Sequence, residues 1–299
     1  MNQVQRAYGE GAYGIALVLA DSAAQYAPDL ADVHFARGLL YSKFNRFDEA
    51  QAAYKKVLAL DPAYRSAWFN LGHNAFLQGQ YRPALGFYRE EEAAIEATPA
   101  ADKQAAPAAY RAAHAAVLLQ IGRVYEKLGA ADTAHATYED ALKIDSSNAQ
   151  AFSWLSELNG QTGDLDRALA HARRAFQLDP NNPEYRYGVG AFLVRTGQAE
   201  QAVGYLEEVV AQQPWHVGAH YNLGRALMAL GRRDEAQRYL EKTDSLQQFD
   251  TDITMARLAT FQYPEDPDRW GHLAALLRSV GRLGEARQAY DVARSLRDS

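Results

Sequence analysis

The segment from His220 to Gln237, HYNLGRALMALGRRDEAQ, decides the fold. Its apolar spacing predicts one helix over residues 221–230 and a second helix from Asp234 onward. Gly231 lies between them, and glycine adopts positive φ without steric cost, so it can end the first helix. Asp234 would meet the positive end of the second helix dipole. The segment is therefore predicted to be a helical hairpin.

The same pattern returns along the chain, in most places every 34 residues. If Gly224 is position 8 of a repeating unit, position 15 is the turn residue, which is glycine in six units and Asn45 in the first. After glycine, asparagine is the residue that most readily adopts the left-handed backbone conformation. Position 20 is alanine in all seven units: Ala50, Ala84, Ala134, Ala168, Ala202, Ala236 and Ala286. Position 24 is bulky in six of them: Tyr54, Tyr88, Tyr138, Leu206, Leu240 and Tyr290, with Ala172 in the remaining unit.

These positions describe how each hairpin would pack. Small residues at positions 8 and 20 let two helices approach closely, and bulky residues at position 24 fill the space beside them. One hairpin cannot bury its own apolar face, so neighbouring hairpins are expected to stack. The order Trp68, Leu71, Gly72, Gly79, Ala84 and Tyr88 resembles the W-L-G-G-A-Y skeleton of the tetratricopeptide repeat family. The resemblance covers nearly the whole chain and implies an all-α, right-handed superhelical solenoid of stacked antiparallel helix hairpins.

The repeat count gives a predicted domain organisation. We expect a single domain over residues 1–299, with a half-repeat at 1–30 and seven repeats that start near residues 31, 65, 115, 149, 183, 217 and 267. The first ten residues, MNQVQRAYGE, look too short for the first helix of a full repeat.

Two interruptions are expected, near residues 97–114 and 247–266, where the proline at position 32 is missing. In the first, residues 98–106 are predicted to be a surface loop, followed by a helix that begins at Pro107. In the second, Asp250 or Thr251 is predicted to cap a short extra helix ended by Pro264. The interruptions are either tolerated surface insertions or a docking surface of their own.

Composition excludes several classes of protein. The chain has 299 residues, no cysteine and a formal charge of −6, which excludes disulfides and thiolate chemistry and argues against a general nucleic-acid role. No apolar run is long enough to span a bilayer, and no signal peptide is evident. A cytoplasmic location is therefore favoured, with a periplasmic or exported location after removal of a leader as the alternative.

Few residues carry chemistry. The chain has no glycine-rich phosphate loop and no nucleophile elbow. His216 and His220 are four residues apart but lack an obvious third metal ligand. The acidic run of Glu90, Glu91 and Glu92, with Glu96, is interpreted as a solvated helix face. We therefore expect no enzyme activity, no cofactor and no metal.

The resemblance also implies a binding surface. In this family, positions 2, 5, 6, 9, 12 and 13 of each first helix face a concave groove. The candidate peptide-binding residues at such positions are Phe35, Phe69, Asn70, His73, Arg123, Tyr187, Tyr221, Asn222 and Arg225. Aromatic anchors beside polar groups suit a peptide ligand. Some members bind acidic C-terminal tails through a clamp of lysine, asparagine and arginine side chains. Only Asn70 matches that clamp here, so we do not expect this chain to bind such tails in that way.

Three functions are compatible with this surface. The first is a non-enzymatic scaffold or adaptor that binds a partner peptide or helix in the groove. The second is a structural subunit of a larger, possibly membrane-associated, multiprotein assembly, held by its outer face or by the insertions. The third is the recognition arm of a larger enzyme. In each case the expected partner is another protein.

Overall fold

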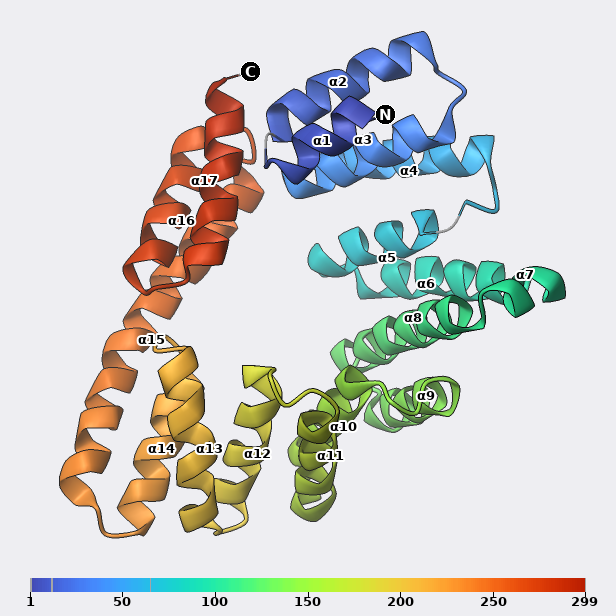
Figure 1. Ribbon diagram of the computed structural model, residues 1–299. Coiled ribbons are helices and arrows are strands. Elements are labelled where there is room, and N and C mark those ends of the chain that lie inside the picture. The colour runs from blue at the N-terminus through green and yellow to red at the C-terminus, as the bar shows by residue number, and fades with distance from the viewer. Residues whose placement is uncertain (1, 12, 65, 299) are drawn as a thin grey trace. The chain divides into compact units, whose positions relative to one another are not determined.

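The computed structural model describes residues 2–11, 13–64 and 66–298, which contain seventeen helices and no strand (Figure 1). Successive helices pack as hairpins, for example α3 with α4 and α10 with α11. The helices are α1 (Asn2–Gly9), α2 (Tyr13–Tyr26), α3 (Ala31–Lys43), α4 (Phe47–Leu60), α5 (Ala67–Leu77), α6 (Tyr81–Glu96), α7 (Ala100–Ala105), α8 (Pro107–Lys127), α9 (Ala131–Ile144), α10 (Ala149–Thr162), α11 (Leu165–Leu178), α12 (Pro183–Arg195), α13 (Ala199–Gln212), α14 (Val217–Ala229), α15 (Arg233–Gln262), α16 (Pro267–Ser279) and α17 (Leu283–Arg297). The expected all-α fold of stacked hairpins is confirmed.

The chain divides into two compact units, and the boundaries fall inside α8 and α15. Unit 1 contains residues 1–110 and 252–299, and unit 2 contains residues 111–251. No helix in the described part of the chain has both the length and the apolar character that a bilayer crossing requires.

The turn between the two helices of each repeat has the predicted backbone. Asn45 has φ of 58°, and the six glycines at the same position have φ between 71° and 90°. Each of these residues ends a first helix in the left-handed region, where most other residues would be strained.

The bulky residue at position 24 packs directly against the small residue at position 8. A methyl group added at Gly122 would lie 2.3 Å from a ring carbon of Tyr138, and one added at Gly72 would lie 2.7 Å from the ring of Tyr88. Both tyrosines are fully buried. The missing side chain of the glycine is therefore the space that the aromatic ring fills.

Two repeats lack glycine at position 8, and they show how the residue there affects position 24. Where position 24 is Ala172, position 8 is Ser156, and its hydroxyl donates to the carbonyl of Ala168 at 2.7 Å. In the last repeat position 8 is Ala274, and Tyr290 remains 55% exposed. A β-carbon at position 8 occupies the space that the other rings enter, so the Tyr290 ring stays at the surface.

A recurring hydrogen bond joins consecutive repeats. A side chain at position 4 bonds to the carbonyl of the residue six places earlier, a proline. The pairs are His34 Nε2 with Pro28 at 2.8 Å, Arg186 with Pro180 at 2.9 Å, His220 Nε2 with Pro214 at 3.0 Å, and Trp270 Nε1 with Pro264 at 2.9 Å. The proline that stops one helix thus also supplies an acceptor for the next.

Two sequence-based predictions about short segments were wrong. The ten N-terminal residues do hold a first helix, α1, with Val4 and Ala7 buried. The predicted loop over residues 98–106 contains the short helix α7, with no buried residue. Alanine has the highest helix propensity, and this stretch is rich in it, so a helical turn forms without support from the core.

The prediction of a separate helix starting at Asp250 or Thr251 was also wrong. α15 is a single helix of 30 residues that runs through both positions. It contains neither glycine nor proline, so nothing in its sequence interrupts the hydrogen-bond ladder before Pro264.

The acidic run on α6 is only partly solvated, which corrects a further prediction. Glu91 is buried, and its carboxylate accepts from the backbone N–H groups of Ser66 at 3.1 Å and Phe69 at 3.2 Å. The first N–H groups of a helix lack partners within it, so a carboxylate from the neighbouring helix satisfies the N-terminus of α5. The predicted repeat start at Arg65 lies outside the described residues.

Unit 1 is built from both ends of the chain. α17 packs against α2, and a single core cluster contains Ala16 and Ala20 from α2 together with Val292 and Ala293 from α17. α2 therefore covers the apolar face of the last repeat.

Candidate functional site

The first helices of three consecutive repeats in unit 2 line a cavity of about 330 Å³. These helices are α10, α12 and α14. Most of the lining residues occupy the positions predicted to face the groove. They are Ser153, Ser156 and Glu157 from α10, Glu184, Tyr185, Tyr187, Gly188, Ala191, Phe192 and Arg195 from α12, Asn222 and Arg225 from α14, and Ala172 from α11.

Asn222 is held rigidly at one wall of this cavity. Its side-chain N–H₂ group donates to the Tyr187 hydroxyl at 3.2 Å and to the Gly218 carbonyl at 3.0 Å. The residue is 8% exposed. Among the described residues, no hydrogen bond to its carbonyl oxygen Oδ1 is present.

Tyr187 is oriented from both sides. Its ring packs on the His216 ring with centroids 4.3 Å apart, while its hydroxyl accepts from Asn222. Burial raises the pKa of Tyr187, although the hydrogen bond from Asn222 acts in the opposite direction. The hydroxyl therefore stays protonated near neutral pH and can act as a hydrogen-bond donor.

The cavity carries charges of both signs. Burial raises the pKa of Glu157, Glu126 raises it further, and Arg123 opposes both effects. Arg195 donates to the Gly160 carbonyl at 2.7 Å, and Arg225 is exposed with its guanidinium 5.7 Å from the Tyr221 ring centroid. The cavity wall thus carries two carboxyl groups, Glu157 with a raised pKa and Glu184, and two cations.

Beside the cavity, side chains of α8, α9 and α10 form a chain of contacts. The Arg123 guanidinium lies 5.0 Å from the Trp154 ring, and Trp154 packs on Tyr138 with centroids 5.7 Å apart. Tyr138 in turn donates to Glu126 at 2.6 Å. These contacts fix Arg123 and Trp154 against each other.

The structure gathers only some of the predicted groove residues. Tyr187, Asn222 and Arg225 line the unit 2 cavity, Tyr221 adjoins it through Arg225, and Arg123 lies on α8. Among lining residues outside the predicted set, Ser153 and Glu184 follow the same rule, since they occupy positions 5 and 2. Ser156, at position 8, was expected only to pack between helices.

The remaining four predicted residues lie in unit 1. Phe35 packs against Tyr64 with centroids 5.0 Å apart, and Phe69 packs against Tyr88 at 5.6 Å. Asn70 donates to the Ser66 carbonyl at 2.7 Å. His73 is exposed.

The two histidines of α14 and its cap have separate roles. His216 caps the helix, because its Nδ1 accepts from the Ala219 N–H at 3.0 Å, and its Nε2 lies 3.5 Å from Glu184. His220 Nε2 bonds to the Pro214 carbonyl. Their ring nitrogens therefore point to different partners rather than to one shared position.

Comparisons with known proteins identify the repeat. Three sequence profiles, each described as "Tetratricopeptide repeat", match residues 31–64, residues 119–183, and residues 161–207 together with 193–260. No curated protein matches the chain significantly.

Several solved structures match the chain. The Cut9–Hcn1 hetero-tetramer of the APC/C matches with a TM-score of 0.62 and 14% identity, covering 81% of this chain and 45% of that chain. MamA matches with a TM-score of 0.47 and 20% identity, covering 62% of this chain and 93% of that one. YrrB, described as a TPR protein with an unusual peptide-binding site, matches with a TM-score of 0.46 and 20% identity, covering 67% and 95%. At these identities the likeness concerns the fold alone.

Proposed function

Because the chain belongs to the tetratricopeptide repeat family, we propose that it is a non-enzymatic scaffold that binds a peptide segment or helix of a partner protein. The unit 2 cavity is the proposed centre of the binding groove, with Tyr187, Tyr221, Asn222 and Arg225 as contact residues and Arg123 beside them.

The observation that carries this proposal is the state of Asn222. Two hydrogen bonds from Nδ2 orient its amide, no hydrogen bond to Oδ1 is present among the described residues, and the residue lines the cavity. A fixed acceptor can pair with a peptide N–H whatever the side chain of that residue, and little conformational entropy is lost on binding. Tyr187 adds an aromatic surface and Arg225 adds an exposed cation, which are common anchors at protein interfaces.

Unit 1 offers a related arrangement, which we propose as a second part of the peptide-binding surface. The Asn70 amide is likewise oriented by a bond from its nitrogen to a backbone carbonyl one turn earlier. Phe35 and Phe69 would supply apolar contacts, and His73 an exposed polar one.

A displayed random-peptide library selected on the intact protein would test the proposal. For a selected peptide, Asn222→Ala and Arg225→Ala should each weaken binding about fivefold, which corresponds to about 1 kcal/mol, the net contribution of a typical hydrogen bond. Fluorescence anisotropy with labelled peptide measures this change. Arg238→Ala is the matched control, since Arg238 is an exposed arginine on α15 in the same unit.

Asn222→Ala also removes two internal hydrogen bonds, so its thermal stability must be measured alongside its affinity. Arg225→Ala lacks this complication because the side chain is exposed. If both variants bind selected peptides as tightly as the Arg238→Ala control, the groove of unit 2 is not the binding surface.

Exposed apolar side chains in unit 1 favour a second candidate function, as a structural subunit of a larger assembly. On α2, Ile15 is 56% exposed, Val18 61% and Tyr26 88%. Ile15 and Val18 are three residues apart and therefore share one helix face, and clustered apolar residues on a surface often mark a protein interface. Val18→Asp should release the protein from a stable complex isolated from its source while leaving peptide binding in unit 2 unchanged.

A further inference from the structure

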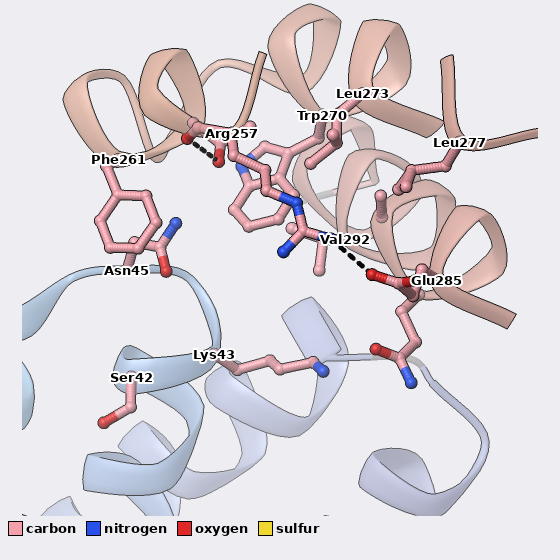
Figure 2. A pocket seen from close by; sticks show the side chains of 13 residues that line it. Ser42, Lys43, Asn45, Arg257, Phe261, Trp270, Leu273, Leu277, Glu285 and Val292 are labelled. Atoms are coloured by element: carbon pink, nitrogen blue, oxygen red, sulfur yellow. Dashed lines mark hydrogen bonds and ion pairs between the residues drawn. The ribbon is translucent and has the colours of Figure 1, made fainter. Parts of the chain in front are cut away.

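A second cavity, of about 280 Å³, lies within unit 1 (Figure 2). Its lining comes from the end of α3 and the following turn, and from α15, α16 and α17. Figure 2 shows the Lys43 side chain extending along one side, with Trp270 and Val292 on the other. Leu273, Leu277 and Ala289 extend the apolar wall.

The carboxylates near this cavity already have cationic partners. Glu285 accepts from Arg282 Nε at 2.6 Å and also pairs with Arg257, while Asp291 lies 3.5 Å from Arg294. Each carboxylate is therefore neutralised by at least one arginine.

Lys43 is different. It is half-buried, its Nζ lies 5.1 Å from the Tyr13 ring centroid, and no ion pair to it is recorded within residues 2–11, 13–64 and 66–298. Burial lowers the pKa of Lys43, against the opposing effect of Asp291. A half-buried ammonium without a bonded carboxylate attracts an anion.

The other lining groups limit what kind of anion fits. The amides of Asn45 and Gln288 can donate to it, whereas the Ser42 hydroxyl already donates to the Gly38 carbonyl at 2.8 Å. A wall of tryptophan and aliphatic side chains disfavours a fully hydrated ion such as phosphate and favours an apolar body. A cavity of this size holds a group about as large as one amino-acid residue, since about 150 Å³ is enough for benzene.

We infer that this cavity binds a carboxylate attached to a compact apolar body, with the carboxylate on Lys43 and the body against Trp270 and Val292. The site is separate from the unit 2 groove and does not depend on the function proposed for that groove. A free small acid and the C-terminal residue of a peptide present the same chemistry, and the experiment distinguishes these two sources.

Isothermal titration of the intact protein with 3-phenylpropionate, hexanoate and indole-3-acetate tests the inference. At least one of these acids should bind at least tenfold more tightly than its neutral carboxamide and than inorganic phosphate. Lys43→Met should weaken that binding at least tenfold, because it keeps most of the length of the unbranched side chain and removes the charge. Lys55→Met is the matched control, since Lys55 is exposed in the same unit.

Acetyl-Ala-Phe with a free carboxylate, compared with its carboxamide, identifies the source. Tighter binding of the free-carboxylate dipeptide than of the small acids indicates a peptide C-terminus, and the reverse order indicates a free small acid. Lys43→Gln serves as a second neutral variant if Lys43→Met does not fold. Saturable binding by none of the acids, or equal affinity of a Lys43 variant and the Lys55→Met control, would overturn the inference.

Discussion

At the scale of the residue, the contact between Gly72 and Tyr88 tests the repeat register most directly. Gly72→Leu places a branched side chain where a β-carbon alone would be 2.7 Å from the buried ring. Overpacking of this kind costs about 1–3 kcal/mol or more. Urea unfolding should show that loss for Gly72→Leu and almost none for Lys55→Leu at the surface. Equal losses would mean that the assigned register is wrong.

His220 makes stability depend on pH. Burial lowers its pKa, and Nδ1 is buried without a hydrogen bond among the described residues. The unfolded chain therefore binds a proton more readily than the folded one. The contribution of His220 is complete above the unfolded pKa of about 6.5 and is lost as pH falls below it.

Thermal melts between about pH 7.5 and pH 5.5 measure this effect, since that range brackets the unfolded histidine pKa. His220→Gln should reduce the loss of melting temperature on acidification, because glutamine can still donate to the Pro214 carbonyl but does not titrate. His272→Gln, at an exposed site, should leave the loss unchanged. An unchanged loss in His220→Gln would show that other groups, such as His171, whose pKa burial also lowers, dominate this range.

At the scale of the element, α15 shows the effect of a missing stop signal. Thr251 lies inside the helix, and its hydroxyl donates to the Gln247 carbonyl one turn earlier at 3.0 Å. Thr251→Pro should cost about 3 kcal/mol, because proline removes a helical hydrogen bond and clashes with the preceding turn. Thr251→Ala is the matched control and should unfold close to wild type.

This substitution separates two descriptions of the segment. If a new helix began at residue 250 or 251, proline would occupy its first turn, where it is well tolerated. A stable Thr251→Pro variant would therefore contradict the continuous helix. Circular dichroism and urea unfolding measure both outcomes.

At the scale of the whole molecule, the contact of α2 with α17 ties the two ends of the chain into unit 1. A β-carbon at Gly14 would lie 2.5 Å from the Ser295 carbonyl oxygen, whereas one at Gly86 would meet nothing within 4 Å. Gly86 lies inside α6, where alanine is favoured by about 0.5–1 kcal/mol, whereas Gly14 lies in the first turn of α2. Gly86→Ala should therefore stabilise the protein, and Gly14→Ala should destabilise it.

Hydrogen exchange locates the effect. Amides of α17 should exchange faster in Gly14→Ala than in wild type, while those of α12 and α14 in unit 2 should not change. Unchanged exchange in α17 would mean that α2 and α17 do not depend on each other.

The sequence by itself determined the repeat and the residues that build it. Three features define the repeat: turn residues with positive φ, glycine–tyrosine pairs and prolines that end helices. Each acts within one hairpin or between neighbouring hairpins, so it recurs at a fixed spacing that can be recognised in the sequence. The same count placed Tyr187, Asn222 and Arg225 on one face, because first helices stack in register.

Only the tertiary structure decided the burial and the hydrogen bonds that involve residues far apart in the sequence. The carboxylate of Glu91 is buried because the open N-terminus of α5 lies against it, and α2 covers α17 although their residues are separated by most of the chain. Sequence spacing also predicted that Asn222 faces the groove. It did not predict that the Asn222 amide nitrogen donates to the Tyr187 hydroxyl and the Gly218 carbonyl, which fixes the orientation of the amide. Local propensities act over a few residues, whereas burial and hydrogen-bond pairing depend on which helices meet, and that is settled only when the chain has folded.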